Sequence, residues 1–137
     1  MIQRQQTLWL LLSTICGVLS YVLPFFSGTR QANNGIEKAI IDADSTYALM
    51  ILTGISVLLS FITIFLFKNR KLQLRLCLGG IFLSVLIIVL YFLEIKSLSG
   101  SISLSSIFVF AILVGYIMAL IGIRKDEKLV KALDRLR

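Results

Sequence analysis

Residues 45–67, STYALMILTGISVLLSFITIFLF, form a run of 23 residues without a charged side chain. An α-helix rises 1.5 Å per residue, so about 20 apolar residues cross the roughly 30 Å hydrocarbon core of a bilayer. Three further charge-free runs, at 5–29, 76–93 and 97–123, bring the total to 93 of 137 positions. With 58% hydrophobic residues and a mean hydropathy of +0.94, the chain is predicted to be an integral membrane protein rather than a water-soluble enzyme.

The expected fold is an all-α, four-helix membrane bundle followed by a short cytoplasmic tail. The predicted spans are about 8–26, 47–67, 74–93 and 104–123, so residues 1–123 form the bundle and 124–137 the basic tail. In the tail, Leu129, Val130, Leu133 and Leu136 share one face, which predicts a short amphipathic helix.

Two segments connect the spans on the side opposite the tail. In the first, 27–46, Asn33-Asn34-Gly35 is a turn signal, and residues 35–42 are predicted to form a short amphipathic helix on the outer surface. The second, 94–103, is rich in serine and shows no evident chemistry.

Basic residues gather on one side of the predicted membrane. Of the 14 Lys and Arg residues, only Arg30, Lys38 and Lys96 fall on the outer side. The other 11 are Arg4, Lys68, Arg70, Lys71, Arg75, Arg124, Lys125, Lys128, Lys131, Arg135 and Arg137. Because cytoplasmic segments are enriched in Lys and Arg, this distribution predicts that both termini are cytoplasmic. It also accounts for the net charge of +7, so we expect anionic lipid headgroups as partners and no nucleic acid.

Each predicted span carries a line of small or polar residues at spacings of three or four, which places them on one helical face. In chain order the lines are Ser13, Gly17, Ser20 and Pro24; Thr53, Ser56, Ser60 and Thr63; Gln73, Cys77, Gly80 and Ser84; and Ala111, Gly115, Ala119 and Gly122. Helix association in lipid relies on close packing of small residues and on interhelical hydrogen bonds, so we predict that these lines meet inside the bundle, with Ile112 facing lipid. The expected packing residues are Ser13, Gly17, Ser56, Ser60, Gly80, Ser84, Ala111, Gly115 and Ala119.

Residues that carry out catalysis or bind metals are scarce. The chain has no histidine, and its two cysteines, Cys16 and Cys77, fall within spans and form no C-x-x-C motif. No Asp, Glu, Lys or Arg lies within a predicted span, whereas ion-coupled transporters generally hold such a residue at membrane depth. We therefore expect no catalytic activity, no cofactor and no metal.

One polar feature leaves a second function open. The Thr53–Thr63 line predicts either an interhelical seam or a polar pathway in a small homo-oligomeric transporter or channel. Tyr116 places a hydroxyl about halfway along the fourth span, where we expect it to bond to a Ser/Thr seam or to a backbone carbonyl.

The two ends of the chain, MIQRQQTLWLLL at 1–12 and IRKDEKLVKALDRLR at 123–137, resemble a family of small four-span membrane proteins from Bacteroidota, catalogued as domain of unknown function 4293. Chain length and span number agree with that family. The resemblance implies a location in the inner membrane of a diderm bacterium and implies no activity.

The sequence thus favours a non-catalytic accessory or scaffolding subunit of a bacterial inner-membrane complex. Its partner is expected to be another membrane protein, and a homo-oligomer is the other arrangement considered. Asp126 or Glu127 is a candidate to pair with Arg4, because all three are predicted on the same membrane face. The residues expected to contact a partner or lipid are Arg4, Asp126, Glu127, Lys128, Leu129, Leu133, Asp134 and Arg135; Gln3 belongs to the same set.

Overall fold

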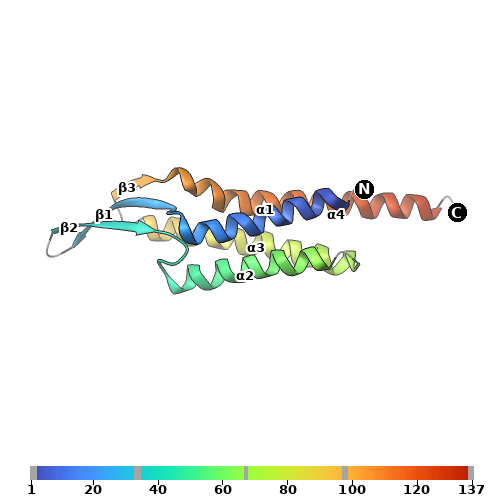
Figure 1. Cartoon of the computed structure of the whole chain (residues 1–137), viewed down its shortest axis with the longest axis horizontal. Helices are drawn as coiled ribbons and strands as arrows, with labels where there is room; N and C mark the ends of the chain where they lie inside the picture. The colour runs from blue at the N-terminus through green and yellow to red at the C-terminus, as the bar shows by residue number, and fades with distance from the viewer. Residues whose placement is uncertain (1–2, 33–34, 67, 97–98, 136–137) are drawn as a thin grey trace.

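Four long helices run side by side in the computed structural model (Figure 1), which describes residues 3–32, 35–66, 68–96 and 99–135. The helices are α1 (Gln3–Val22), α2 (Tyr47–Phe65), α3 (Arg70–Ile95) and α4 (Ile107–Arg135), with a short 3-10 turn, η1 (Leu104–Ser106), leading into α4. All four are long and apolar enough to cross a membrane, which confirms the predicted number of spans.

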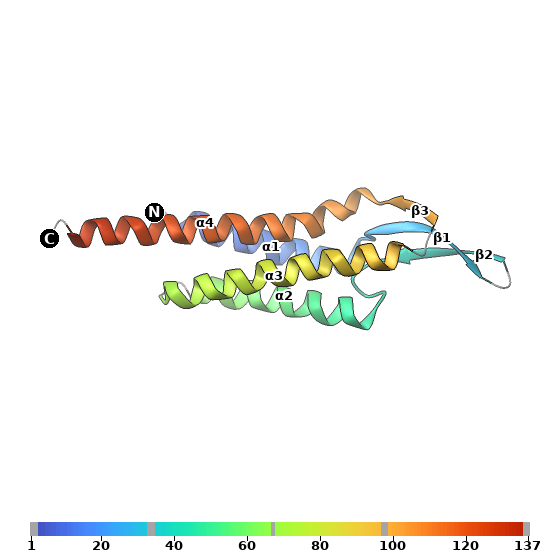
Figure 2. The same cartoon turned by 180° about the vertical axis from the view of Figure 1, so that it is seen from behind.

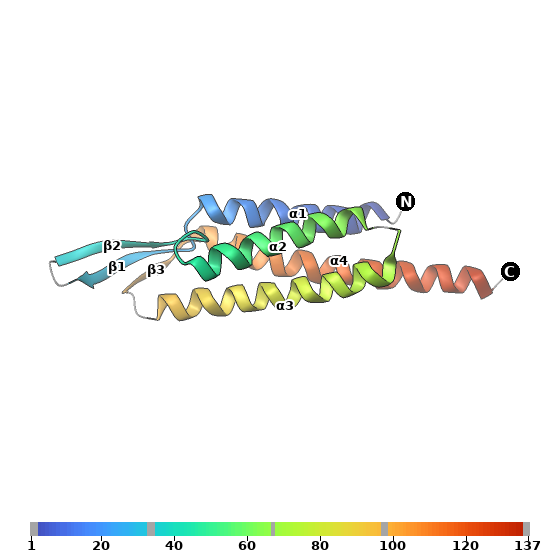
Figure 3. The ribbon, with the colours of Figure 1, turned by 90° about the horizontal axis from the view of Figure 1, so that it is seen from below.

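Each helix packs against the two that neighbour it around the bundle. The pairs in contact are α1 with α2, α2 with α3, α3 with α4, and α4 with α1. Figures 2 and 3 show the same arrangement from two other sides. The polar and small faces meet inside, while large apolar side chains such as Leu58, Phe82 and Ile121 are exposed on the outside, where a bilayer would cover them.

The interior is built from the lines of small and polar residues. On α2 and α3 every member of the predicted lines is buried, as are Ser13, Gly17 and Ser20 on α1 and Gly115 and Ala119 on α4. Pro24, Ala111 and Gly122 are half-buried. Ile112, predicted to face lipid, is only 2% exposed, because it belongs to the buried cluster that α4 shares with Leu10 and Cys16 of α1.

The first outer connection forms strands rather than the predicted short helix. Strand β1 (Phe26–Ala32) pairs antiparallel with β2 (Gly35–Ile41), and β1 also pairs antiparallel with β3 (Ser99–Ile102), which lies in the serine-rich second connection. An isolated helix of eight residues is unstable on its own, whereas a strand here satisfies its backbone against β1. Asn33 and Asn34 of the predicted turn lie outside the described residues.

A pair of glycines lets β3 approach β1. Gly28 and Gly100 are opposite each other in the register, and a Cβ at Gly100 would lie 2.7 Å from the carbonyl oxygen of Ser27. Phe25 makes two further backbone hydrogen bonds that anchor the sheet. Its carbonyl accepts a hydrogen bond from the N–H of Ser103 at 3.0 Å, and the N–H of Phe25 donates to the carbonyl of Ile41 at 2.7 Å.

Aromatic packing joins the sheet to the helices. Phe25 and Phe26 follow Pro24, which cannot continue α1, and both are buried together with Ile41 and Leu49. The ring of Tyr91 stacks on Phe25 with a centroid separation of 4.2 Å. The sheet therefore packs on the end of the bundle through a small core that it shares with α2, α3 and α4.

The tail is not a separate helix. Helix α4 continues without a break from Ile107 to Arg135, so the predicted boundary near residue 123 does not exist in the backbone. In Figure 1 the last turns of α4 extend beyond the first turn of α1 and beyond the α2–α3 connection.

Candidate functional site

The end of the bundle opposite the sheet collects 11 of the 14 basic residues by sequence. It holds the start of α1, the short connection from α2 to α3, and the part of α4 that follows Ile123 (Figure 1). We call it the basic end.

Asp126 is the buried centre of the basic end. Its side chain is 7% exposed, and its Oδ2 accepts a hydrogen bond from Nε2 of Gln6 on α1. The backbone carbonyl of Asp126 accepts a hydrogen bond of 3.4 Å from Nη1 of Arg70, at the start of α3. A single position on α4 therefore binds both α1 and α3.

Gly122 explains how Gln6 reaches this carboxylate. Gly122 precedes Asp126 by one helical turn and lies on the same face of α4. A Cβ at Gly122 would lie 2.9 Å from Cγ of Gln6, so glycine makes room for the Gln6 side chain against α4. Oδ1 of Asp126 is buried and has no hydrogen-bond partner within the described part of the chain.

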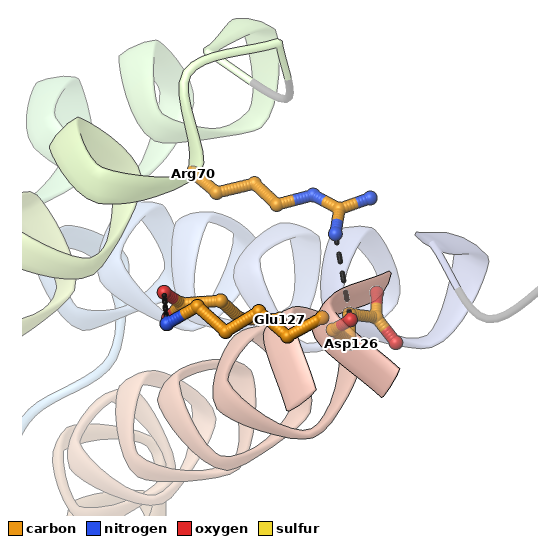
Figure 4. Close-up of polar contacts among 4 residues, drawn as sticks. Arg70, Asp126 and Glu127 are labelled. Atoms are coloured by element: carbon orange, nitrogen blue, oxygen red, sulfur yellow. Dashed lines mark hydrogen bonds and ion pairs between the residues drawn. The ribbon is translucent and has the colours of Figure 1, made fainter. Parts of the chain in front are cut away.

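Glu127 faces a different partner. Its carboxylate forms an ion pair of 2.8 Å with Nζ of Lys131, one turn further along α4. Figure 4 shows Arg70 directed toward Asp126, with Glu127 beside it on the same helix. Because Lys131 is well exposed, this pair adds little stability.

The residues predicted from the tail are placed as follows. Lys128, Leu129 and Leu133 are exposed on α4. Asp134 and Arg135 lie within α4, and Gln3 and Arg4 lie within α1, but the side chains of these four residues are not among those that the structure describes. The pairing of Arg4 with Asp126 or Glu127 therefore stays a prediction. The bonds that the structure gives to Asp126 and Glu127 come from Gln6, Arg70 and Lys131.

A groove of about 540 Å³ opens between the start of α3 and the extended part of α4. It is lined by Lys68, Asn69, Arg70, Lys71, Leu72, Arg75, Glu127, Val130 and Lys131. Five of these side chains are cationic and one is a carboxylate. In the sequence, the basic residues of 68–75 indicate only the orientation of the chain in the membrane. Their shared groove with the tail is a long-range contact that no local spacing reveals.

Two hydroxyls of the line on α2, those of Ser60 and Thr63, form hydrogen bonds within the bundle. The hydroxyls of Ser60 and Thr63 bond to carbonyls one turn earlier, those of Val57 at 2.9 Å and Leu59 at 2.5 Å. Ser60 also contacts the Thr14 hydroxyl on α1 at 2.8 Å.

Tyr116 reaches across the bundle to the same line. Its hydroxyl donates to the carbonyl of Ser56 at 2.7 Å, and the side chain is fully buried. Thr53 Oγ1 is buried and lacks a hydrogen-bond partner among the residues that the structure describes.

The cysteines and acidic residues were also compared with the arrangements that bind metal ions. Cys16 and Cys77 are buried free thiols on α1 and α3. Within the described ranges, no group of three His, Cys, Asp or Glu residues is arranged to hold a metal ion.

The comparisons with known proteins agree with the resemblance seen at the chain ends. No curated protein and no solved structure shows a significant match to the sequence. One family matches over residues 2–136, nearly the whole chain, and is described as Domain of unknown function (DUF4293). The chain belongs to this family.

Proposed function

We propose that this protein is a non-catalytic accessory or scaffolding subunit of a membrane-protein complex in a bacterial inner membrane. The observation that carries the proposal is the extension of α4, which continues beyond the bundle as an unbroken helix with an exposed apolar face. Leu129 is 44% exposed and Leu133 is 67% exposed. The assignment to a diderm bacterium rests on the resemblance of the chain ends to proteins from Bacteroidota.

The chemistry of the extension defines the partner that fits it. The apolar side chains of Leu129, Val130 and Leu133 lie between exposed cationic side chains, including Lys128 and Lys131. An apolar ridge with acidic residues on its flanks would match this face in both hydrophobicity and charge. A membrane protein with such a cytoplasmic segment would dock on the extension while the bundle holds it at the membrane.

Side-chain contacts from two other helices hold the base of the extension. Gln6 and Arg70 bind α4 at Asp126, immediately before the exposed face begins. The helix that would contact the partner is therefore fixed to α1 and α3 rather than attached by a flexible linker.

The basic end is assigned to the cytoplasm because 11 of 14 Lys and Arg residues belong to it by sequence. A phosphatase reporter that is active only outside the cytoplasm, fused after Arg137, is expected to be silent. The same reporter inserted after Lys96 is expected to be active. Activity of the fusion after Arg137, with a silent insertion, would reverse the orientation.

The docking role is tested with the double variant Leu129→Ala/Leu133→Ala. When this variant is purified from the native membrane in a mild detergent, the co-purifying membrane protein is expected to be lost. The reason is that two exposed apolar side chains of the docking face are removed. The matched control is Leu58→Ala/Ile121→Ala, which removes two exposed apolar side chains within the spans. Retention of the partner by the tail variant, or equal loss in both variants, contradicts docking on the extension.

The transporter hypothesis gives the opposite result in a second assay. The hydroxyls of Ser60 and Thr63 are already bonded to carbonyls, and Tyr116 crosses the line at Ser56, which favours a seam over a pathway. Pure protein in liposomes is therefore expected to move neither ions nor small solutes. Robust uptake that is lost in Ser60→Ala would replace the scaffold proposal with a transporter.

A further inference from the structure

The groove at the basic end concentrates positive charge. Its lining contains Lys68, Arg70, Lys71, Arg75 and Lys131 against the one carboxylate of Glu127, a formal net charge of +4. Positive-inside orientation requires basic residues near the membrane, but it does not require residues from two separate elements to line one groove. Orientation alone therefore does not account for the convergence of the α2–α3 connection with the extended α4.

Most of this charge forms no ion pair with an acidic side chain among the described residues. The Glu127 carboxylate is already paired with Lys131. Lys68, Lys71 and Arg75 form no ion pair with any acidic side chain in the described part of the chain. Arg70 uses Nη1 for a 3.4 Å bond to a carbonyl, while a guanidinium has five N–H donors in all. The groove thus retains unused donors of the kind that bind phosphate oxygens.

The start of α3 adds to the positive potential. Its first turn contains no acidic residue, and Asn69 makes no side-chain capping bond. Cations at the positive end of a helix are unfavourable, because they repel the partial charge of the unpaired N–H groups. An anion in the groove would offset both this cost and the repulsion between neighbouring cations.

The groove lies where lipid headgroups would be. It begins three residues after Phe65, the last residue of α2, and extends over the first turns of α3. Its lining also includes two apolar side chains, Leu72 and Val130, which are 44% and 40% exposed. A lipid presents a phosphate and an acyl chain together, so it matches both the cationic and the apolar parts of this lining.

We propose that this groove is a binding site for the phosphate groups of an anionic membrane lipid. Arg75 and the free donors of Arg70 bind phosphate oxygens, while Lys68 and Lys71 neutralise the remaining charge. Leu72 and Val130 contact the upper part of an acyl chain. A headgroup with two phosphates uses the net charge of the groove more completely than one with a single phosphate. The site shares Val130 and Lys131 with the docking face, whereas Leu129 and Leu133, the residues changed in the docking test, do not line the groove.

The test measures lipid binding to the purified full-length protein in neutral detergent. Cardiolipin, which carries two phosphates, is titrated while bound lipid is counted by native mass spectrometry; phosphatidylcholine serves as the neutral lipid. The double variant Lys71→Ala/Arg75→Ala is expected to bind cardiolipin about tenfold more weakly than the wild type. Arg70 is left intact because it also bonds to Asp126.

The control variant, Arg124→Ala/Lys125→Ala, removes the same charge from exposed positions of α4 that do not line the groove. It is expected to bind cardiolipin within twofold of the wild type. Equal weakening in both variants would show general attraction to a basic surface and overturn the site. Helix content by circular dichroism must match in all three proteins, and Lys68→Ala provides a second, smaller change should the double variant fail to fold.

A further arm identifies the source of the phosphate. Millimolar inorganic phosphate is expected to leave cardiolipin binding unchanged, because it supplies charge without an acyl chain. Displacement of the lipid by inorganic phosphate at that concentration would overturn the lipid assignment in favour of a soluble phosphate ligand. Binding of cardiolipin no tighter than phosphatidylcholine would overturn the proposal altogether.

Discussion

Gly80→Leu is expected to lower the thermal unfolding temperature of the detergent-solubilised protein by about 10 °C. A Cβ at Gly80 would lie within 2.6 Å of three ring carbons of Tyr116. That ring has no free space to enter, since it is fully buried and its hydroxyl is bonded to the Ser56 carbonyl. Overpacking of this kind costs about 1–3 kcal/mol, and leucine adds three carbons beyond the Cβ.

The neighbouring residue provides the control for this prediction. Gly79 lies on the same helix, and a Cβ there would meet nothing within 4 Å. Gly79→Leu therefore makes the same chemical change toward open space and is expected to shift the unfolding temperature by less than about 3 °C. Adding Tyr116→Ala to Gly80→Leu is expected to recover part of the lost stability. Equal shifts for the two glycines would mean that Tyr116 does not pack on Gly80.

Gly115→Leu is expected to have the second large effect, because it forces α1 and α4 apart. A Cβ at Gly115 would overlap the Ser13 hydroxyl and would lie 2.9 Å from the carbonyl oxygen of Trp9. Ser13 also donates a 3.0 Å hydrogen bond to the Ile112 carbonyl, which the displaced side chain would lose. The expected destabilisation is on the order of 2–3 kcal/mol, measured by thermal unfolding in detergent.

A substitution on the exposed side of α4 gives the baseline for Gly115. Ile117→Leu, at a position 39% exposed, is expected to change stability by less than about 0.5 kcal/mol. The clash has two parts, which are separated by combining Gly115→Ala with Ser13→Ala in a double variant. Ser13→Ala removes the hydroxyl that the new Cβ would overlap, while the Trp9 carbonyl stays in place. The double variant should thus be more stable than the sum of the single effects predicts. Strict additivity would argue against the contact between Ser13 and Gly115.

The four helices and their buried faces could be predicted from helical periodicity in the sequence. Residues such as Ser56 and Ser84 recur at spacings of three and four within apolar runs, and this pattern depends only on local geometry. The structure buries both. Tyr116 followed from the same reasoning, since a hydroxyl at membrane depth needs an acceptor and finds one at Ser56.

The outer sheet could not be inferred in this way. Residues 35–41 have an amphipathic pattern that suits a short helix or an edge strand, and the choice depends on β1. Strand β3 is further removed, because Ser99–Ile102 pairs with residues about 70 positions earlier in the chain. Two glycines, Gly28 and Gly100, permit that approach, but glycine in a connecting segment is equally typical of a turn and does not by itself indicate strand pairing.

The candidate site was predicted in part. Asp126 was selected from its position near the membrane, but its contacts with Gln6 and Arg70 join segments 120 and 56 residues apart. Of the three acidic residues in the tail, Asp126 alone continues the line of Ala119 and Gly122 at helical spacing, a signal that was not used. The groove was not predicted, because the start of α3 and the extended part of α4 are far apart in the sequence. Each segment alone shows only basic residues that flank a span.

The three-stranded sheet acts as a clasp at one end of the protein. Strand β1 follows α1, β2 leads into α2, and β3 joins α3 to α4, so backbone hydrogen bonds tie all four helices together there. At the other end, the side-chain bonds made to Asp126 oppose separation of α4 from α1 and α3. Because the sheet end is held by backbone hydrogen bonds and the basic end by a few side-chain bonds, the helices are expected to separate first at the basic end. A molecule that binds at the basic end therefore acts where the helices are easiest to move.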